Sequence, residues 1–200
     1  MTQALRILAL AGSARRDSLH KKLAQRAADM ARLHGAQVQW IDLADFELPL
    51  YHGDLEEAHG QPAKALELRA LVKSHDALVI ASPEYNGFFS PLLKNTLDWL
   101  SRALPGEERH ATFKDKPVLL LSTARGDSGG VRGLQTLRQL LINLKAQPYS
   151  QSFALPNGPA AFETRDRLQA DQSQRLASLV HTFIHELQQP SIHQPLYANV

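Results

Sequence analysis

Three short segments combine Ser, Arg, Gly and aromatic residues in a way that suits the binding of an anionic or flat ligand. They cover residues 12–18, 82–91 and 122–130, and each follows a short apolar run. In the first segment Ser13 and Ser18 offer hydroxyl groups, and helical spacing begins directly after them. The free N–H groups at the start of a helix attract anions. We therefore expect a phosphate group to bind here; an ordinary serine-capped turn is the alternative.

The second and third segments could contact the face and the edge of a ring. Gly87 permits close approach of the backbone, Tyr85 supplies an aromatic surface, and the glycine-rich third segment supplies amides for a polar ring edge or a second phosphate. A rigid surface turn with its aromatic side chains in the core is the alternative for the second segment. The pair Asn86-Gly87 is typical of a β-hairpin, but the sequence after it predicts a helix, so we do not expect a hairpin.

Two common nucleotide-binding motifs do not match the first segment. The P-loop pattern fails because its second glycine and its Lys-Ser/Thr pair are missing. The dinucleotide fingerprint fails because Gly12 is the only glycine in the turn. Asp42 stands at the end of the second apolar run, where an acidic residue could meet a ribose, but a solvated strand end is the simpler interpretation.

Other catalytic or metal-binding patterns are not expected in this sequence. His181 and His185 are four residues apart, yet the His-Glu-x-x-His motif and a third ligand are missing, so a place on a helix surface or an interface is favoured. Asp17, Ser18 and His20 are too close in one turn to converge as a hydrolase triad. The absence of cysteine excludes disulfides, thiolate metal sites and thiol redox chemistry. Any redox role would need a bound cofactor.

Composition narrows the class of protein further. The chain has 200 residues, 44% of them apolar, and a formal net charge of +2. This length suits a single domain, 1–200, with an irregular tail over 188–200. Long basic tracts for nucleic acid, a membrane span and a signal peptide are not found, so a cytoplasmic protein is expected.

Strands and helices are expected to alternate along the chain. Continuously apolar runs predict strands over 6–11, 38–42, 77–81, 118–122 and about 149–154. Helical spacing, with Ser18 as the first N-cap, predicts helices over about 19–34, 62–74, 91–102, 134–145 and 165–187. This alternation predicts an α/β fold, a doubly wound three-layer sandwich around a five-stranded parallel sheet. The stretch 43–61 is longer than most connections, which suggests a function.

These segments together resemble the NADPH-dependent FMN reductases, a family that includes bacterial quinone and chromate reductases. The resemblance rests on Gly12-Ser13 to Ser18, on Pro83-Glu84-Tyr85-Asn86 with Leu93-Lys94-Asn95 and Asp98-Trp99 behind it, and on the third segment. It covers residues 5–152, and it implies a flavodoxin-like fold with sheet order 2-1-3-4-5. His20 departs from the family pattern, which usually has asparagine there.

The resemblance also implies which residues hold the cofactor, FMN. Its phosphate would lie among Ser13, Arg15, Ser18, Leu19 and His20. Its ring would be lined by Pro83, Glu84, Tyr85, Asn86 and Gly87, and approached by Ser122, Thr123, Ala124, Arg125 and Gly126. Amides near Ala124 would stabilise negative charge on the reduced ring, and Arg125 would assist or bind the NADPH phosphate. No acid–base pair is implied.

The implied activity is hydride transfer from NADPH or NADH through FMN to a small acceptor such as a quinone, free flavin, azo compound or chromate. The alternative is an FMN-binding electron carrier or a regulatory module without its own nicotinamide site. Relatives form dimers or tetramers, so a homodimer or homotetramer is expected. Phe88, Phe89 and Trp99 flank the third helix and could form the interface, although Trp99 could equally pack in the core.

Overall fold

Five short strands form one parallel sheet, around which the other elements are arranged. The computed structural model describes residues 4–163 and 167–189. The strands of the sheet are β1 (Arg6–Ala11), β2 (Gln37–Asp42), β3 (Ala77–Ala81), β6 (Pro117–Thr123) and β7 (Gln147–Leu155). Their order is β2-β1-β3-β6-β7, and every neighbouring pair is parallel. The predicted order is confirmed, because β6 and β7 are the fourth and fifth strands of this sheet.

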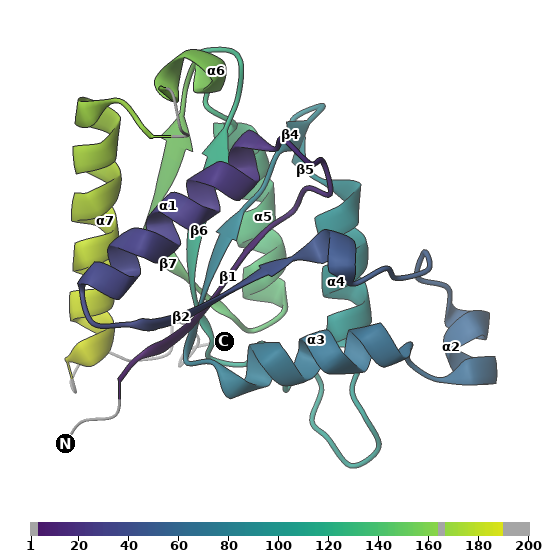
Figure 1. The fold of residues 1–200 in the computed structure, drawn as a ribbon. Helices are drawn as coiled ribbons and strands as arrows, with labels where there is room; N and C mark the ends of the chain where they lie inside the picture. Colours follow the sequence, from purple (N-terminus) through teal and green to yellow (C-terminus); the bar gives the residue numbers. More distant parts are fainter. Residues whose placement is uncertain (1–3, 164–166, 190–200) are drawn as a thin grey trace.

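Helices cover both faces of the sheet (Figure 1). One face packs against α1 (Leu19–Leu33) and α7 (Ala170–Gln188). The other packs against α3 (Ala63–Ser74), α4 (Pro91–Ser101) and α5 (Val131–Asn143). The predicted three-layer sandwich is therefore confirmed.

Successive residues of the central strands alternate between the two cores. In β1, Ile7 and Ala9 face the α1 side, whereas Leu8 and Leu10 face the α3 and α4 side. All four side chains are almost completely buried. A strand with both faces covered needs an apolar residue at every position, which explains its continuously apolar sequence.

Several helix boundaries differ from the prediction. The fourth predicted helix, α5, begins three residues earlier, because Gly130 adopts a left-handed conformation (φ 88°) and ends the preceding turn. The last helix begins at Ala170 in the structure, whereas its predicted start at residue 165 lies outside the described residues. Residues 190–200 of the predicted tail also lie outside them.

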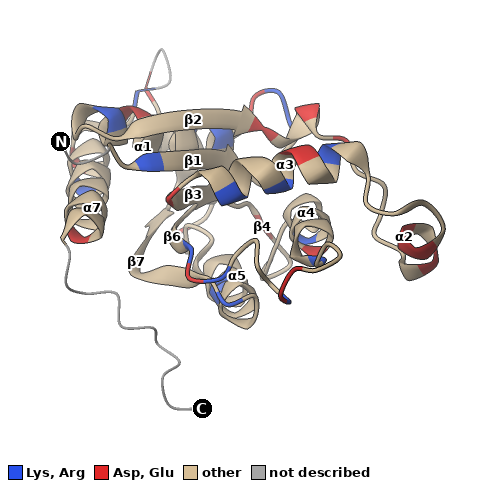
Figure 2. Cartoon of the chain, turned by 90° about the horizontal axis from the view of Figure 1, so that it is seen from below, with Lys and Arg blue, Asp and Glu red and all other residues tan. Residues whose placement is uncertain are grey.

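The long stretch 43–61 forms a short 3-10 helix, η1 (Leu43–Asp45), an extended run and a helix, α2 (Gly53–His59). Two side chains of α4, those of Asn95 and Trp99, bind its extended run by hydrogen bonds. The Asn95 amide donates to the Pro49 carbonyl (2.9 Å) and accepts from the Tyr51 N–H (2.8 Å). The Trp99 ring N–H donates to the same Pro49 carbonyl (2.8 Å). Figure 2 shows α2 standing apart from the layers at the end of this segment.

The aromatic residues beside α4 are mostly in the core. Trp99 is 0% exposed and Phe89 is 3% exposed, whereas Phe88 is 50% exposed. An interface role is therefore wrong for Phe89, and for Trp99 the alternative of core packing is confirmed, because both side chains are buried inside this chain. Among the described residues, no helix is long and apolar enough to cross a membrane.

Candidate functional site

The three segments singled out by the sequence lie at one end of the molecule (Figure 1). Residues of all three line one cavity. They follow the carboxyl ends of β1, β3 and β6, where ligands bind in open α/β sheets. The cavity has a volume of about 490 Å³, within the range of small-molecule sites. It is lined by Ser13, Arg15, Asp17, Ser18, Leu19, His20, Pro83, Glu84, Tyr85, Thr123, Ala124, Arg125 and Pro159.

Four residues predicted to bind the cofactor do not line this cavity. Asn86 and Gly87 form the tip of a turn, and Gly126 lies beyond the lining part of the third segment. Ser122 is 0% exposed, and its hydroxyl group donates to the Ser82 carbonyl (2.8 Å). Its side chain therefore holds two loops together beneath the cavity.

Two lining residues, Asp17 and Pro159, were not predicted from the sequence. Asp17 lies within the first segment, between residues that were predicted. Pro159 belongs to a short helix, α6 (Gly158–Ala161), which follows β7. The tertiary fold brings α6 to the cavity, where the N–H of Gly158, the first residue of α6, donates to the Ala124 carbonyl (2.8 Å). No sequence signal around Pro159 indicates a site.

The start of α1 provides donors for an anion. Ser18 is the N-cap, and its hydroxyl oxygen accepts the N–H groups of His20 (3.2 Å) and Lys21 (3.4 Å). The Leu19 N–H has no partner within the described chain, and the Ser18 O–H is available to donate. The Ser13 hydroxyl oxygen accepts the Arg15 N–H (3.4 Å), and its own O–H is available to donate to a ligand. An anion here would also meet the positive end of the helix dipole.

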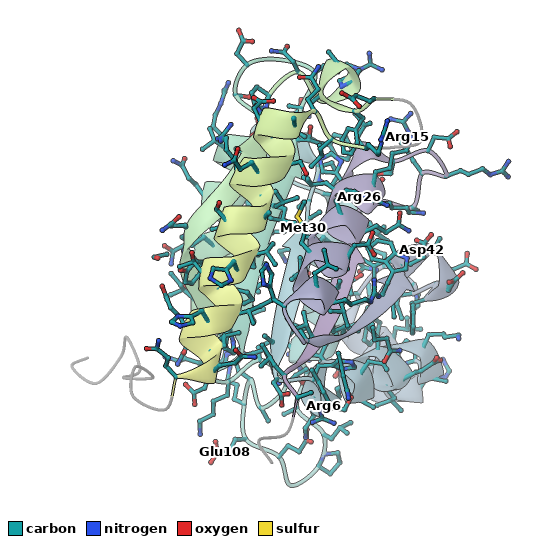
Figure 3. The ribbon with its side chains drawn as sticks, turned by 60° about the vertical axis from the view of Figure 1, so that its left-hand side comes forward. Arg6, Arg15, Arg26, Met30, Asp42 and Glu108 are labelled. Carbon is teal, nitrogen blue, oxygen red and sulfur yellow. The ribbon has the colours of Figure 1, made fainter. Side chains whose placement is uncertain are left out.

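Positive charge is present at the same end of α1. Arg15 is exposed, lines the cavity and stands at the beginning of the helix in Figure 3, at the opposite end of the molecule from Arg6 and Glu108. Arg125, from the third segment, is a second exposed cation on the lining. Two guanidinium groups and several N–H and O–H donors favour a ligand that carries a phosphate.

His20 links the first and third segments. The Thr123 N–H donates to His20 Nε2 (3.3 Å), across 103 residues of chain. Burial lowers the pKa of His20 to about 4, against the effect of the Thr123 hydrogen bond and helped by the charge of Arg15. The imidazole is therefore neutral at pH 7, and because Nε2 accepts, Nδ1 carries the proton. This histidine brings a neutral N–H donor to the position where the family usually has asparagine.

The second segment forms a small β-hairpin, which the sequence analysis had rejected. Its strands are β4 (Glu84–Tyr85) and β5 (Phe88–Phe89), paired antiparallel. Asn86 (φ 54°) and Gly87 (φ 79°) make the turn, and both positive angles are typical of the tight hairpins that favour Asn-Gly. The helix begins at Pro91, as predicted. The hairpin was missed because residues 84–89 before this helix still have room for two paired residues on each side of the turn.

Glycines in the third segment serve close packing. A Cβ atom on Gly129 would lie 2.8 Å from backbone atoms of Ala154 and Leu155, and one on Gly130 would overlap the Ser122 hydroxyl. In the lining itself, the Ala124 N–H donates to the Leu155 carbonyl (3.2 Å). Within the described residues, the N–H groups of Arg125, Gly126, Asp127 and Ser128 have no acceptor, and of these four residues Arg125 lines the cavity.

The remaining sequence candidates lie outside the cavity. The Asp42 carboxylate binds Lys21 Nζ (2.5 Å) and accepts the Ala44 N–H (3.0 Å), so it is less solvated than expected. His181 lies on the exposed side of α7, with its ring 4.7 Å from the ring of His34. In the part of the chain that the structure describes, no group of three or more His, Cys, Asp or Glu residues could hold a metal ion.

The fold and the cavity together define a flavodoxin-like protein with a cavity suited to a phosphate-bearing cofactor at the edge of its sheet. Residues 5–160 match the family model of the NADPH-dependent FMN reductases, and the chain belongs to this family. It is therefore an oxidoreductase that uses FMN, with a reduced nicotinamide nucleotide as electron donor. The cavity fits FMN, because its lining includes phosphate donors at the start of α1 and the half-exposed Tyr85 side chain.

Proteins that are similar to this chain are named as reductases or oxidoreductases of nicotinamide nucleotides. The chain is 30% identical over 177 residues to an NAD(P)H-dependent FMN reductase of Pseudomonas aeruginosa, and the aligned region covers 88% of this chain and 91% of that protein. It is 38% identical over 142 residues to an NADPH:quinone oxidoreductase of Arabidopsis thaliana, covering 70% and 68%. The flavoenzyme NAD(P)H:(acceptor) oxidoreductase FerB of Paracoccus denitrificans has a similar fold, with a TM-score of 0.78, 23% identity, and 92% and 97% coverage. The two sequence relatives are reductases, which favours an enzyme over an electron carrier.

The neutral state of His20 predicts how acid affects the cofactor-free protein. A folded-state pKa of about 4, below the ordinary value of 6.5, means that the unfolded chain binds the proton first as the pH falls. Stability from this residue is complete above pH 6.5 and is lost between pH 6.5 and 4. We expect His20→Asn to lose less stability than the wild type between pH 7 and pH 5, by on the order of 1 kcal/mol because the side chain is partly exposed.

Urea unfolding of both proteins at pH 7 and pH 5 measures this difference. His34→Asn is the matched control, because His34 is an exposed histidine at the C-terminal end of α1 and does not line the cavity. Equal losses of stability in wild type and His20→Asn would contradict the assigned protonation state.

Proposed function

We propose that this cavity holds FMN with its phosphate at the start of α1 and its ring between the hairpin and the third loop, and that the acceptor is a small flat molecule of the quinone class. FMN, when bound, supplies hydride transfer between the nicotinamide nucleotide and the acceptor. The observation that carries the proposal is one cavity whose lining combines phosphate donors at the start of α1 with the half-exposed aromatic side chain of Tyr85. The quinone reductase among the relatives supports this acceptor class; free flavins, azo compounds and chromate are the alternatives to test beside it.

The chain's own residues have three tasks in this proposal. Ser13, Ser18 and the Leu19 N–H bind the phosphate, and Arg15 neutralises part of its charge. Pro83 and Tyr85 form a wall for the ring. The N–H of Arg125 has no acceptor in the described chain, and it would stabilise negative charge at the pyrimidine edge of the reduced ring. Positioning and charge stabilisation then replace an acid–base pair.

Cofactor binding tests the proposal directly. We expect the purified protein to bind FMN with one site per chain in a calorimetric titration, and the bound FMN to lose its visible absorbance when NADPH or NADH is added without oxygen. Quinone should then restore the absorbance. A protein that gives no heat with FMN, or whose bound FMN is not bleached by either nucleotide, would contradict the proposed function.

Arg125 is the candidate for contact with the nicotinamide nucleotide. It is exposed on the cavity lining, and a guanidinium group binds phosphate through charged hydrogen bonds. We expect Arg125→Ala to raise the KM for NADPH roughly tenfold, the size of one charged hydrogen bond, with a smaller effect on FMN binding.

Steady-state kinetics with NADPH and NADH measure the effect of this change. Arg132→Ala is the matched control, because Arg132 is also exposed and lies seven residues further along but does not line the cavity. An unchanged KM for both nucleotides in Arg125→Ala would reject the role.

We also propose that the protein works as a homodimer or homotetramer in the cytoplasm, where a reduced nicotinamide nucleotide is supplied. The support for association is the exposure of two apolar side chains outside the cavity lining, Phe88 (50% exposed) on β5 and Val131 (40%) on α5, which packs against β5. Multi-angle light scattering should give a mass of two or four chains for the wild type and a smaller mass for Phe88→Ser. A monomeric wild type at micromolar concentration would refute the proposed assembly.

A further inference from the structure

Glu84 makes a hydrogen bond that its place in the cofactor-binding motif does not explain. Its carboxylate oxygen Oε2 accepts the N–H of Gly133, 49 residues further along the chain, at 2.8 Å. Glu84 is the first residue of the hairpin, and Gly133 lies in the first turn of α5. The bond therefore connects the second cofactor loop to the helix that follows the third.

Helix α5 lacks a cap from its own sequence. Its N-cap residue is Gly130, which has no side chain to accept a hydrogen bond, and its first turn contains no acidic residue. The first N–H groups of a helix have no partner within the helix, and they carry the positive end of its dipole. A carboxylate is the most suitable group to satisfy both needs. Glu84 supplies it from another element.

Gly133 is the second half of this arrangement. A Cβ atom there would lie 3.1 Å from Glu84 Cβ and 3.3 Å from the Phe88 carbonyl oxygen. Glycine is a poor helix former, so its presence inside the first turn needs a reason. The reason is close packing, because the hairpin lies directly against the helix at this residue. Contacts of both hairpin strands with α5 agree with this arrangement.

We propose that Glu84 is a positioning residue, which caps α5 from the hairpin and thereby fixes the second and third cofactor loops to each other. Tyr85, the next residue, lines the cavity, and the third loop runs directly into α5. Movement of the hairpin relative to α5 would change the width of the space between the hairpin and the third loop. This inference rests on the proposed function, in which the FMN ring occupies that space.

The test compares Glu84→Ala with Glu84→Gln and with a distant control. Glutamine keeps an acceptor oxygen at the same distance along the side chain, whereas alanine removes it. We expect alanine to weaken FMN binding roughly tenfold, the size of one charged hydrogen bond, and glutamine to restore at least half of that loss on a logarithmic scale. Glu67→Ala on α3 is the control, because it removes the same side chain from an exposed i,i+3 ion pair. It should bind FMN like the wild type.

Gly133→Ala provides an independent variant that keeps the carboxylate. Its methyl group would lie 3.1 Å from Glu84 Cβ, so the hairpin must shift away from α5, while alanine favours the helix. We therefore expect weaker FMN binding with little change in the thermal midpoint. This variant also serves if Glu84→Ala folds poorly. The proposal is overturned if Gly133→Ala binds FMN as tightly as the wild type, or if Glu84→Gln is no better than Glu84→Ala.

Amide hydrogen exchange in the cofactor-free protein tests the cap without FMN. We expect the Gly133 N–H to exchange at least about tenfold faster in Glu84→Ala than in the wild type and Glu67→Ala, because it loses its acceptor. Equal exchange rates would overturn the cap. If the wild type does not bind FMN at all, the proposed function fails, whereas this exchange measurement still decides whether Glu84 caps α5.

Discussion

The parallel pairing of β1, β3 and β6 is the constraint on which the rest of the site depends. The pairing continues one residue beyond the strands, since the Gly12 N–H donates to the Ala81 carbonyl (2.8 Å) and the Ser82 N–H donates to the Leu121 carbonyl (2.9 Å). Parallel strands end at the same edge, so loops that are about 70 and 40 residues apart in the chain emerge side by side. The cavity exists because of this shared edge, and the buried apolar runs keep the strands in register.

Contacts between the loops hold the cavity in one shape. The Ser90 hydroxyl donates to the Gly12 carbonyl (2.6 Å), which ties the start of α4 to the phosphate loop. Thr123 binds His20, and Glu84 binds Gly133. Each bond joins a different pair of loops, so the order of the donors at the cavity does not depend on a ligand being present. A preorganised set of donors binds a charged cofactor at a lower entropic cost than a flexible one.

Much of the fold follows from local patterns. The predicted bounds of β1 and β3 agree with the structure, because a strand covered on both faces is apolar throughout and is flanked by turn residues. The start of α1 follows from Ser18 as a capping residue. The hairpin and α2 were not predicted, because two-residue strands and a seven-residue helix are too short to show periodicity. Pro159 was missed because only the path of α6 after β7 brings it to the cavity.

The sequence by itself determined the alternation of strands and helices, the three loops and the family resemblance that pointed to FMN, since each depends on residues that are neighbours in the chain. Only the tertiary structure decided that Trp99 is buried against Pro49, that the Ser122 side chain lies beneath the cavity, and that the Glu84 carboxylate meets α5. These hydrogen bonds join residues 50, 40 and 49 positions apart. Partners at such distances leave no spacing pattern in the chain, and they are chosen by which layers pack together.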